Sequence, residues 1–244
     1  VKYGLSPVKL DQASSSSQEG IYHWIPLENL IPNTRYYYEV QGQEFGVKSF
    51  KTSPAIGDFS TNFTFCMYAD PRTNNGYRGP IDEDNPYGEV LPQYILEHFD
   101  NENKELAFTI VAGDIVGRGV EYDSWWLWLN DTTYRDFAGS AALQVAIGNH
   151  EHHDDPTARN FHNFYPYKTC NYSYTYGQVH VVVLDSYDYE NGEWVGVDFP
   201  QDQKQWAIND LKKHSSVPFK IIAIHQSAIN YGNFMFEDDH HGHI

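Results

Sequence analysis

The sequence predicts a mixed α/β domain preceded by a partial all-β domain. Beyond about residue 60, apolar runs of strand length alternate with segments that have the spacing of amphipathic helices. Before residue 53 the chain instead carries Tyr-rich stretches separated by turn residues. The chain has 244 residues, of which 41% are hydrophobic. This is enough for one large packed domain and a fragment of a second.

We place the first domain at residues 1–53 and the second at residues 60–244, joined by a linker that starts at Ser53-Pro54. We expect the N-terminal strands of the first domain, and the C-terminal end of the second, to be missing. The expected strands are 21–27, the Tyr-rich part of 30–40, 47–52, 64–69, 107–112, 143–147, 179–184 and 219–224. The expected helices are 87–99, 124–137 and 202–214.

The charge balance restricts the partners of this chain. The formal net charge is −17 and the pI is near 4.9, so nucleic acid and anionic membranes would be repelled. No run of about 18 apolar residues occurs, and we therefore expect no membrane span. A small phosphate ester would need local metal charge to offset the negative field.

Several features favour a secreted glycoprotein. Asn-x-Ser/Thr triplets begin at Asn62, Asn130 and Asn171, and Lys and Arg together number only 16. We prefer Asn130 and Asn171 as glycosylation sites, because Asn62 begins an expected buried strand. The chain opens at Val1 without a signal-peptide pattern, which indicates a processed or incomplete chain. The two cysteines, Cys66 and Cys170, are consistent with either a disulfide or free thiols.

Residues able to bind metal follow the apolar runs. Four of the five runs in the second domain end at or next to such a residue, and the fifth ends at Asp185. The four positions are Asp70, Asp114, Asn149-His150 and His225. Because ligand sites of open α/β sheets lie beyond the carboxyl ends of the strands, we expect these groups to converge. Oxygen and nitrogen donors without cysteine suit Mn, Fe or Zn, and a shared Asp can bridge two ions.

These blocks resemble a known family. Gly113-Asp114, Gly148-Asn149-His150-Glu151 and the strand-end His225 are similar, in order and spacing, to core blocks of the calcineurin-like metallophosphoesterases. Asp70 fills the place of the first block, so the resemblance covers about residues 60–230. The pattern of residues 30–40 resembles the last strands of a fibronectin type III domain, and this combination is similar to the purple acid phosphatases. The resemblance implies a β-sandwich flanked by helices.

The resemblance also implies a role for each matching residue. Asp70 would bind the first metal, Asp114 would bridge both metals, and Asn149 and His225 would bind the second. His150 would sit by the phosphate and protonate the leaving oxygen or stabilise charge. The implied reaction is hydrolysis of a small phosphate ester by a metal-bound hydroxide at a dinuclear site of two Fe, Mn or Zn ions.

The first-metal ligands depart from the family pattern. Most of the family has Asp-x-His where this chain has Asp70-Pro71-Arg72. The purple acid phosphatases replace that His with a Tyr three residues after the bridging Asp, and here that position is Gly117. We expect Arg72 to face the phosphate instead, because a guanidinium matches its oxygens well. Without the Tyr, the violet tyrosinate colour is expected to be absent.

The last block of the family, Gly-His-x-His, has two interpretations here. Gly242-His243 resembles its start, which makes His243 a candidate ligand. However, the block should follow a helix and an apolar strand, and the segment after His225 is too short and polar for both. The alternative is that the block lies beyond the end of this chain. His240, His241 and His243 would then line the pocket mouth or belong to an exposed tail.

Two functional hypotheses follow, and both use the same fold. The first is an active phosphatase or phosphodiesterase, since the retained ligand set has no other purpose. The second is a degenerate relative with a weakened or single-metal site, acting as an extracellular binding or structural subunit. Other hydrolase chemistry on the same scaffold, such as nucleotidase or pyrophosphatase action, is a third possibility.

Other conspicuous residues have structural interpretations. We expect His152 and His153 to face solvent in a loop, and Asp82-Glu83-Asp84 to form a solvated loop. Asp185 and Tyr187 are interpreted as a strand-end turn, with a place on the rim of the site as the alternative. We expect the Trp residues of the second helix to pack between helix and sheet; they are Trp125, Trp126 and Trp128.

Overall fold

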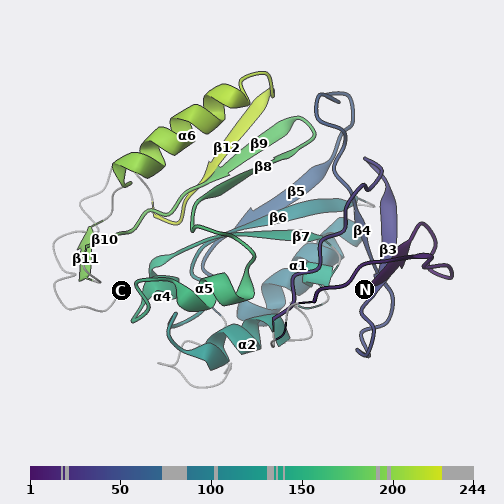
Figure 1. Cartoon of the computed structure of the whole chain (residues 1–244), viewed down its shortest axis with the longest axis horizontal. Helices are drawn as coiled ribbons and strands as arrows, with labels where there is room; N and C mark the ends of the chain where they lie inside the picture. The colour runs from purple at the N-terminus through teal and green to yellow at the C-terminus, as the bar shows by residue number, and fades with distance from the viewer. Residues whose placement is uncertain are drawn as a thin grey trace.

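The computed structural model describes residues 1–17, 19, 22–72, 87–101, 104–130, 135, 137–139, 141–190, 193–196 and 199–226 (Figure 1). Within these ranges, none of the helices is long and apolar enough to cross a membrane. The acidic run at Asp82-Glu83-Asp84 and the C-terminal histidines lie outside the described residues, so the interpretations of His240, His241 and His243 stay as predictions.

The N-terminal region forms one antiparallel sheet in the order β2-β1-β3-β4. Its strands are β1 (Lys2–Gly4), β2 (Gln12–Ala13), β3 (Arg35–Glu39) and β4 (Lys48–Lys51). β3 and β4 confirm two of the expected strands, and the rings of Tyr36 and Phe50 stack across them at 5.9 Å. The short strands β1 and β2 were not predicted, because two or three paired residues leave no periodic pattern.

The expected strand at residues 21–27 is wrong, because the described residues 22–27 form no strand. Pro26 lacks the N–H that a paired strand donates, and its carbonyl accepts a hydrogen bond from the Ser14 hydroxyl at 2.8 Å. The apolar side chains of this segment pack elsewhere, as Tyr22 shows by meeting the Phe164 ring edge-on at 5.1 Å. Tyr22 therefore packs against α5 and not within a strand pair.

The described residues after position 60 contain two three-stranded sheets and a two-stranded hairpin (Figure 1). The first is parallel, with β6 (Leu106–Ala112) between β5 (Thr64–Tyr68) and β7 (Ala142–Ala146). The second pairs β9 (Val179–Val183) with parallel β12 (Phe219–Ala223) and antiparallel β8 (Tyr172–Tyr176). All five expected strands are confirmed, whereas β8 and the hairpin of β10 (Asp188–Glu190) and β11 (Glu193–Gly196) were not predicted.

The two sheets share a core. Phe108 and Ile110 of β6 pack with Val181 and Val183 of β9 in one buried cluster, so the sheets hold each other by their apolar faces. β5 is an edge strand and only partly buried, which corrects the expectation that it is a core strand. The chain is thus a mixed α/β protein with an antiparallel N-terminal sheet.

Helices cover the outer faces of these sheets (Figure 1). They are α1 (Tyr87–Asn101), α2 (Tyr122–Asn130), α4 (Asn149–His152), α5 (Arg159–Phe164) and α6 (Gln201–Lys213). Ala207 of α6 packs on Val182 of β9. Trp125 and Trp128 of α2 are fully buried, which confirms the packing interpretation, but Trp126 is 50% exposed. Beyond Asn130 the expected second helix falls partly outside the described residues.

Candidate metal centre

The carboxyl ends of β5, β6, β7 and β12 meet at one edge of the molecule. Asp70 follows β5, Asp114 follows β6, Asn149 follows β7 and His225 follows β12. Backbone hydrogen bonds fasten the loops after β5 and β6 to each other, since Asp70 N–H donates to the Gly113 carbonyl at 3.1 Å. Sequence elements up to 155 residues apart, from position 70 to position 225, therefore contribute to one site.

The backbone around the two Asp residues is strained. Asp70, Arg72 and Asp114 have φ values of 57°, 31° and 55°, in the left-handed region that residues with a side chain disfavour. Each such residue costs about 1–2 kcal/mol. Gly113 has a φ of 84°, and a Cβ atom there would lie 2.6 Å from His225 Nδ1. Strain of this kind is concentrated at functional sites.

Asp114 is the centre of the arrangement and is fully buried. Its Oδ1 lies 3.2 Å from His225 Nε2 and accepts a hydrogen bond from the His150 N–H at 3.1 Å. Its Oδ2 lies 2.7 Å from the Arg72 guanidinium. Burial by itself raises the pKa of Asp114, but the His225 hydrogen bond and the charges of His225, His150 and Arg72 outweigh it and lower the pKa. Asp114 is therefore held as a carboxylate.

His225 is oriented by the backbone. Its Nδ1–H donates to the Ala112 carbonyl at 2.7 Å, so Nε2 points to Asp114. This second hydrogen bond is how metal-binding histidines are usually held. Burial lowers the pKa of His225, but the hydrogen bond and charge of Asp114 raise it to about 9. Without a cation the ring and the carboxylate form a buried ion pair.

Asp70, Asp114 and His225 fit a cation. One ligand atom from each lies within 4.8 Å of the others. Two carboxylates and an imidazole suit Mn, Fe or Zn. Asn149 lies beside them and is 9% exposed, with its Oδ1 accepting a hydrogen bond from the Tyr187 hydroxyl at 3.0 Å. Among the described residues its Nδ2 has no hydrogen-bond partner, so the N–H donors of this amide are unsatisfied inside the site.

His150 is turned toward the same carboxylate. Its Nδ1 lies 2.5 Å from the Gly117 carbonyl and donates to it, which leaves Nε2 directed inward, 3.8 Å from Asp114 Oδ2. Burial is the main cause that lowers the pKa of His150. The ring is thus neutral near pH 7 and has its inward nitrogen available for proton exchange.

Arg72 occupies the space between the two Asp residues. Its guanidinium is 2.7 Å from Asp114 Oδ2 and 3.5 Å from Asp70 Oδ1. Among the described residues, its ion-pair partners are these two carboxylates. The side chain is 36% exposed, so it also reaches the open side of the site.

Glu151 is a structural element of the site to which sequence reasoning gave no role. It is fully buried and accepts four backbone N–H bonds at 2.7–3.0 Å, from Asp114, Ile115, Val116 and Gly148. These bonds tie the loop after β6 to the loop after β7. Burial and the charge of Asp114 raise the pKa of Glu151 to about 7, while the N–H bonds lower it.

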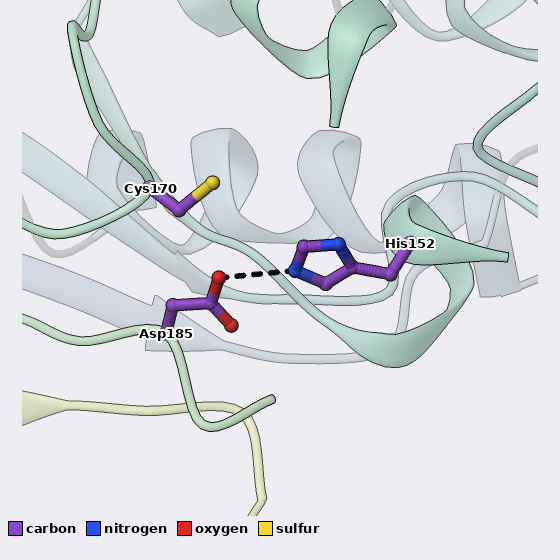
Figure 2. Close-up of side chains that lie close together, drawn as sticks. All are labelled: His152, Cys170 and Asp185. Carbon is purple, nitrogen blue, oxygen red and sulfur yellow. Dashed lines mark hydrogen bonds and ion pairs between the residues drawn. The ribbon is translucent and has the colours of Figure 1, made fainter. Parts of the chain in front are cut away.

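Two sequence interpretations near the site need correction. His152 does not face solvent; it is 4% exposed, because α4 turns it inward, where Nε2 lies 3.0 Å from Asp185 Oδ2 (Figure 2). Tyr187 is not part of an ordinary exposed turn, since it is buried and donates to Asn149. His153 is partly exposed, 28% at the side chain.

The remaining predicted positions are the possible glycosylation sites and the two cysteines. Asn171 lies just before β8 and is partly buried, Asn130 is the last residue of α2, and Asn62 is exposed. Cys66 and Cys170 are free thiols in separate hydrophobic clusters. The disulfide that the sequence left open is therefore not formed.

Comparison with known proteins shows the fold. No protein-family model matches this chain, and no curated protein matches its sequence. Among solved structures it is similar to purple acid phosphatase PPD1 from yellow lupin (Lupinus luteus) seeds, with a TM-score of 0.54 and 16% identity over 80% of this chain and 37% of that chain. It is also similar to PhoD, with a TM-score of 0.55 and 16% identity over 79% of this chain and 47% of that chain. The chain thus spans less than half of either structure, and its fold resembles that of these two proteins.

Proposed function

We propose that this protein hydrolyses phosphate esters with the help of a cation held by Asp70, Asp114 and His225. The observation that carries the proposal is the convergence of these three side chains, within 4.8 Å, at the strand ends of a fold similar to a purple acid phosphatase. Asn149 would be a further ligand, and Asp114 would bridge two ions where two are bound. The retained strain at Asp70 and Asp114 supports a functional site.

The bound cation, His150 and Arg72 would each have a separate role in the reaction. Bound Fe, Mn or Zn would supply positive charge for the phosphate and lower the pKa of a coordinated water. His150 Nε2 would first accept a proton and then pass it to the leaving oxygen, because the Nδ1–H is fixed on the Gly117 carbonyl and Nε2 holds the lone pair. Arg72 would stabilise negative charge on phosphate oxygens, for which its partly exposed guanidinium is suited.

One observation favours the alternative of a degenerate site. The Arg72 guanidinium contacts both Asp114 and Asp70, so it satisfies the carboxylates that a first metal would otherwise join. A site in which Arg72 replaces one cation would hold a single ion or none. The protein would then act as an extracellular binding or structural subunit.

The same fold likeness supports the finer architecture that we propose. The two sheets of the second domain would be the metallophosphoesterase sandwich, and residues 1–53 the end of a fibronectin type III-like domain in front of it. Contacts of Arg35 and Lys51 with Glu105 join the two parts. Secretion, with glycans on Asn130 and Asn171, is likewise part of the proposal.

Elemental analysis of the purified protein, combined with hydrolysis of a generic aryl phosphate, tests the function. We expect Mn, Fe or Zn to be bound, with turnover. Asp114→Asn should lose both the bound metal at this site and at least 100-fold of the turnover, roughly the loss expected for a central electrostatic group. Asp123→Asn, a change of the same kind on an exposed position of α2, is the matched control and should retain both.

The results of this experiment distinguish an active phosphoesterase from a degenerate site. Full activity of Asp114→Asn would refute the proposed centre. A wild-type protein that binds one ion or none and has no turnover would favour the degenerate alternative. In that case Arg72→His, which restores the family pattern Asp-x-His, should increase metal binding.

A further inference from the structure

A second group of potential ligands lies beside the candidate metal centre. His152 comes from α4, Cys170 from the segment before β8, and Asp185 from the end of β9 (Figure 2). One ligand atom from each lies within 4.8 Å of the others, and His152 Nε2 is 3.0 Å from Asp185 Oδ2. Elements that are distant in sequence thus bring a nitrogen, a sulfur and an oxygen donor together.

The group is sheltered from solvent. The side chains of His152 and Asp185 are 4% and 14% exposed, and Cys170 packs against the hydrophobic cluster around Phe161. Burial, followed by the charge of Asp185, raises the pKa of the Cys170 thiol far above its usual value. A cation would remove the unfavourable pairing of sulfur and carboxylate.

A second imidazole approaches Cys170 from α5. His162 Nε2 lies 3.7 Å from Cys170 Sγ. The other ring nitrogen, Nδ1, lies 3.0 Å from the Tyr167 carbonyl and must donate to it, which leaves Nε2 as the nitrogen with a lone pair. This is the arrangement that prepares a histidine for metal binding. His162 is therefore a neighbour of the sulfur and lies outside the three-residue group.

The other His-rich group of the described residues behaves differently. His180, Asp210 and His214 also lie close together, but both ring nitrogens of His180 are used. They lie 2.8 Å from Thr175 Oγ1 and 2.6 Å from Asp210 Oδ2. The His180 and His214 rings stack at 3.9 Å, so their in-plane lone pairs do not converge on one point. This group is a satisfied hydrogen-bonded cluster.

We propose that His152, Cys170 and Asp185 bind a Zn²⁺-type divalent cation. Three protein ligands with mixed sulfur, nitrogen and oxygen donors suit zinc. On binding, the sulfur–metal bond forms and the thiol proton is released to solvent. The ion would join α4 to the ends of β8 and β9. Because α4 also carries Asn149 and His150, the site would fix the position of the candidate catalytic edge.

Cobalt is the probe, because a Co²⁺–thiolate bond gives a charge-transfer absorption that oxygen and nitrogen ligands do not give. Metal-stripped protein titrated with Co²⁺ should develop this band with one thiolate-bound ion per chain. Cys170→Ser should lose the band, and Cys66→Ser is the matched control that should keep it, as the protein has two cysteines. Asp114→Asn should also keep the band, which separates this site from the proposed catalytic one.

Alkylation of the thiols followed by mass spectrometry tests the site without any variant. Under native conditions Zn²⁺ should reduce the alkylation rate of Cys170 at least tenfold, and a chelator should restore it, while Cys66 responds to neither.

Asp185→Asn and His152→Gln should each weaken the binding of Co²⁺ in the titration and retain the thiolate band at high cobalt concentration. Absence of the band in the wild-type protein, its persistence in Cys170→Ser, or a Zn²⁺-independent alkylation rate of Cys170 would overturn the proposal.

Discussion

Gly113 shows how closely the backbone and the ligands of the candidate centre are packed. Its φ of 84° is disfavoured for any residue with a side chain, and a Cβ atom would lie 2.6 Å from His225 Nδ1 and 2.8 Å from His225 Cβ. His225 in turn is held by contacts with Ala112 and Asp114. Glycine at this position therefore permits the approach of β12 to β6.

Gly113→Ala is expected to destabilise the protein and displace His225. The left-handed backbone alone should lower the free energy of unfolding by about 1–2 kcal/mol. The clash of the new Cβ atom with His225 should lower it further. Gly42→Ala is the matched control, since Gly42 has a φ of 79° with nothing within 4 Å of the added Cβ. Thermal unfolding should show a larger loss for Gly113→Ala than for Gly42→Ala. An equal decrease in Tm for the two variants would mean that the displacement of His225 costs no stability.

Glu151 is expected to hold the loops of the site together. Glu151→Gln replaces one of two acceptor oxygens by an NH₂ group that faces backbone N–H donors. We expect a loss of roughly 2–4 kcal/mol in the free energy of unfolding, because charged hydrogen bonds are lost and buried donors are left unmet. Glu97→Gln changes an exposed residue of α1 and should stay within about 0.5 kcal/mol. Urea denaturation of both variants provides the measurement.

The ligand positions could be predicted from sequence, and their neighbours could not. Asp114 and His225 follow strongly apolar strands, so the rule that strand ends meet at one edge places them near each other. Tyr187 and Cys170 reach their positions through loops whose course depends on the whole packed domain. No local pattern marks them, and the predicted solvent exposure of His152 failed because a four-residue helix has no readable periodicity.

One buried histidine adds a polar contact to the apolar packing between α6 and β9. His180 of β9 is 1% exposed, and its Nε2 lies 2.6 Å from Asp210 Oδ2 of α6. Asp210→Ala should remove this partner and leave a buried polar nitrogen unmet, at about 1–3 kcal/mol. Asn209→Ala, on the exposed side of the same helix, is the control and should have a small effect. A urea midpoint for Asp210→Ala equal to that of the control would contradict this assignment.

Two neighbouring strands, β9 and β8, show what a sequence pattern can and cannot reveal. β9 is a run of Val residues buried on both faces, and it could be recognised from composition alone. β8 alternates Tyr with Ser and Thr, and its partial burial gives a weaker pattern. In residues 22–27 the apolar pattern reflects contacts with a neighbouring element, so hydrophobicity indicated burial but not strand pairing.

The candidate metal centre connects the two sheets of the second domain. Asp70 and Asp114 follow strands of the parallel sheet and His225 follows a strand of the mixed sheet, so a cation bound to all three would add a further link between the sheets. A ligand that binds the folded state and not the unfolded state stabilises the folded state by mass action. The free energy of unfolding rises by about 2.7 kcal/mol when the ligand concentration is a hundred times its Kd. Stability of the whole domain should therefore depend on metal.

Treatment with a chelator should lower the Tm of the wild-type protein, and added Mn²⁺ or Zn²⁺ should restore it. In Asp114→Asn the chelator effect should become smaller, and in the combination of Asp114→Asn with Cys170→Ser it should disappear, because both proposed sites are then removed. Asp123→Asn should respond as the wild type does. Differential scanning calorimetry with and without chelator measures these shifts. A wild-type Tm that does not change on chelation, with metal loss verified by elemental analysis, would show that the sheets are held by their apolar core alone.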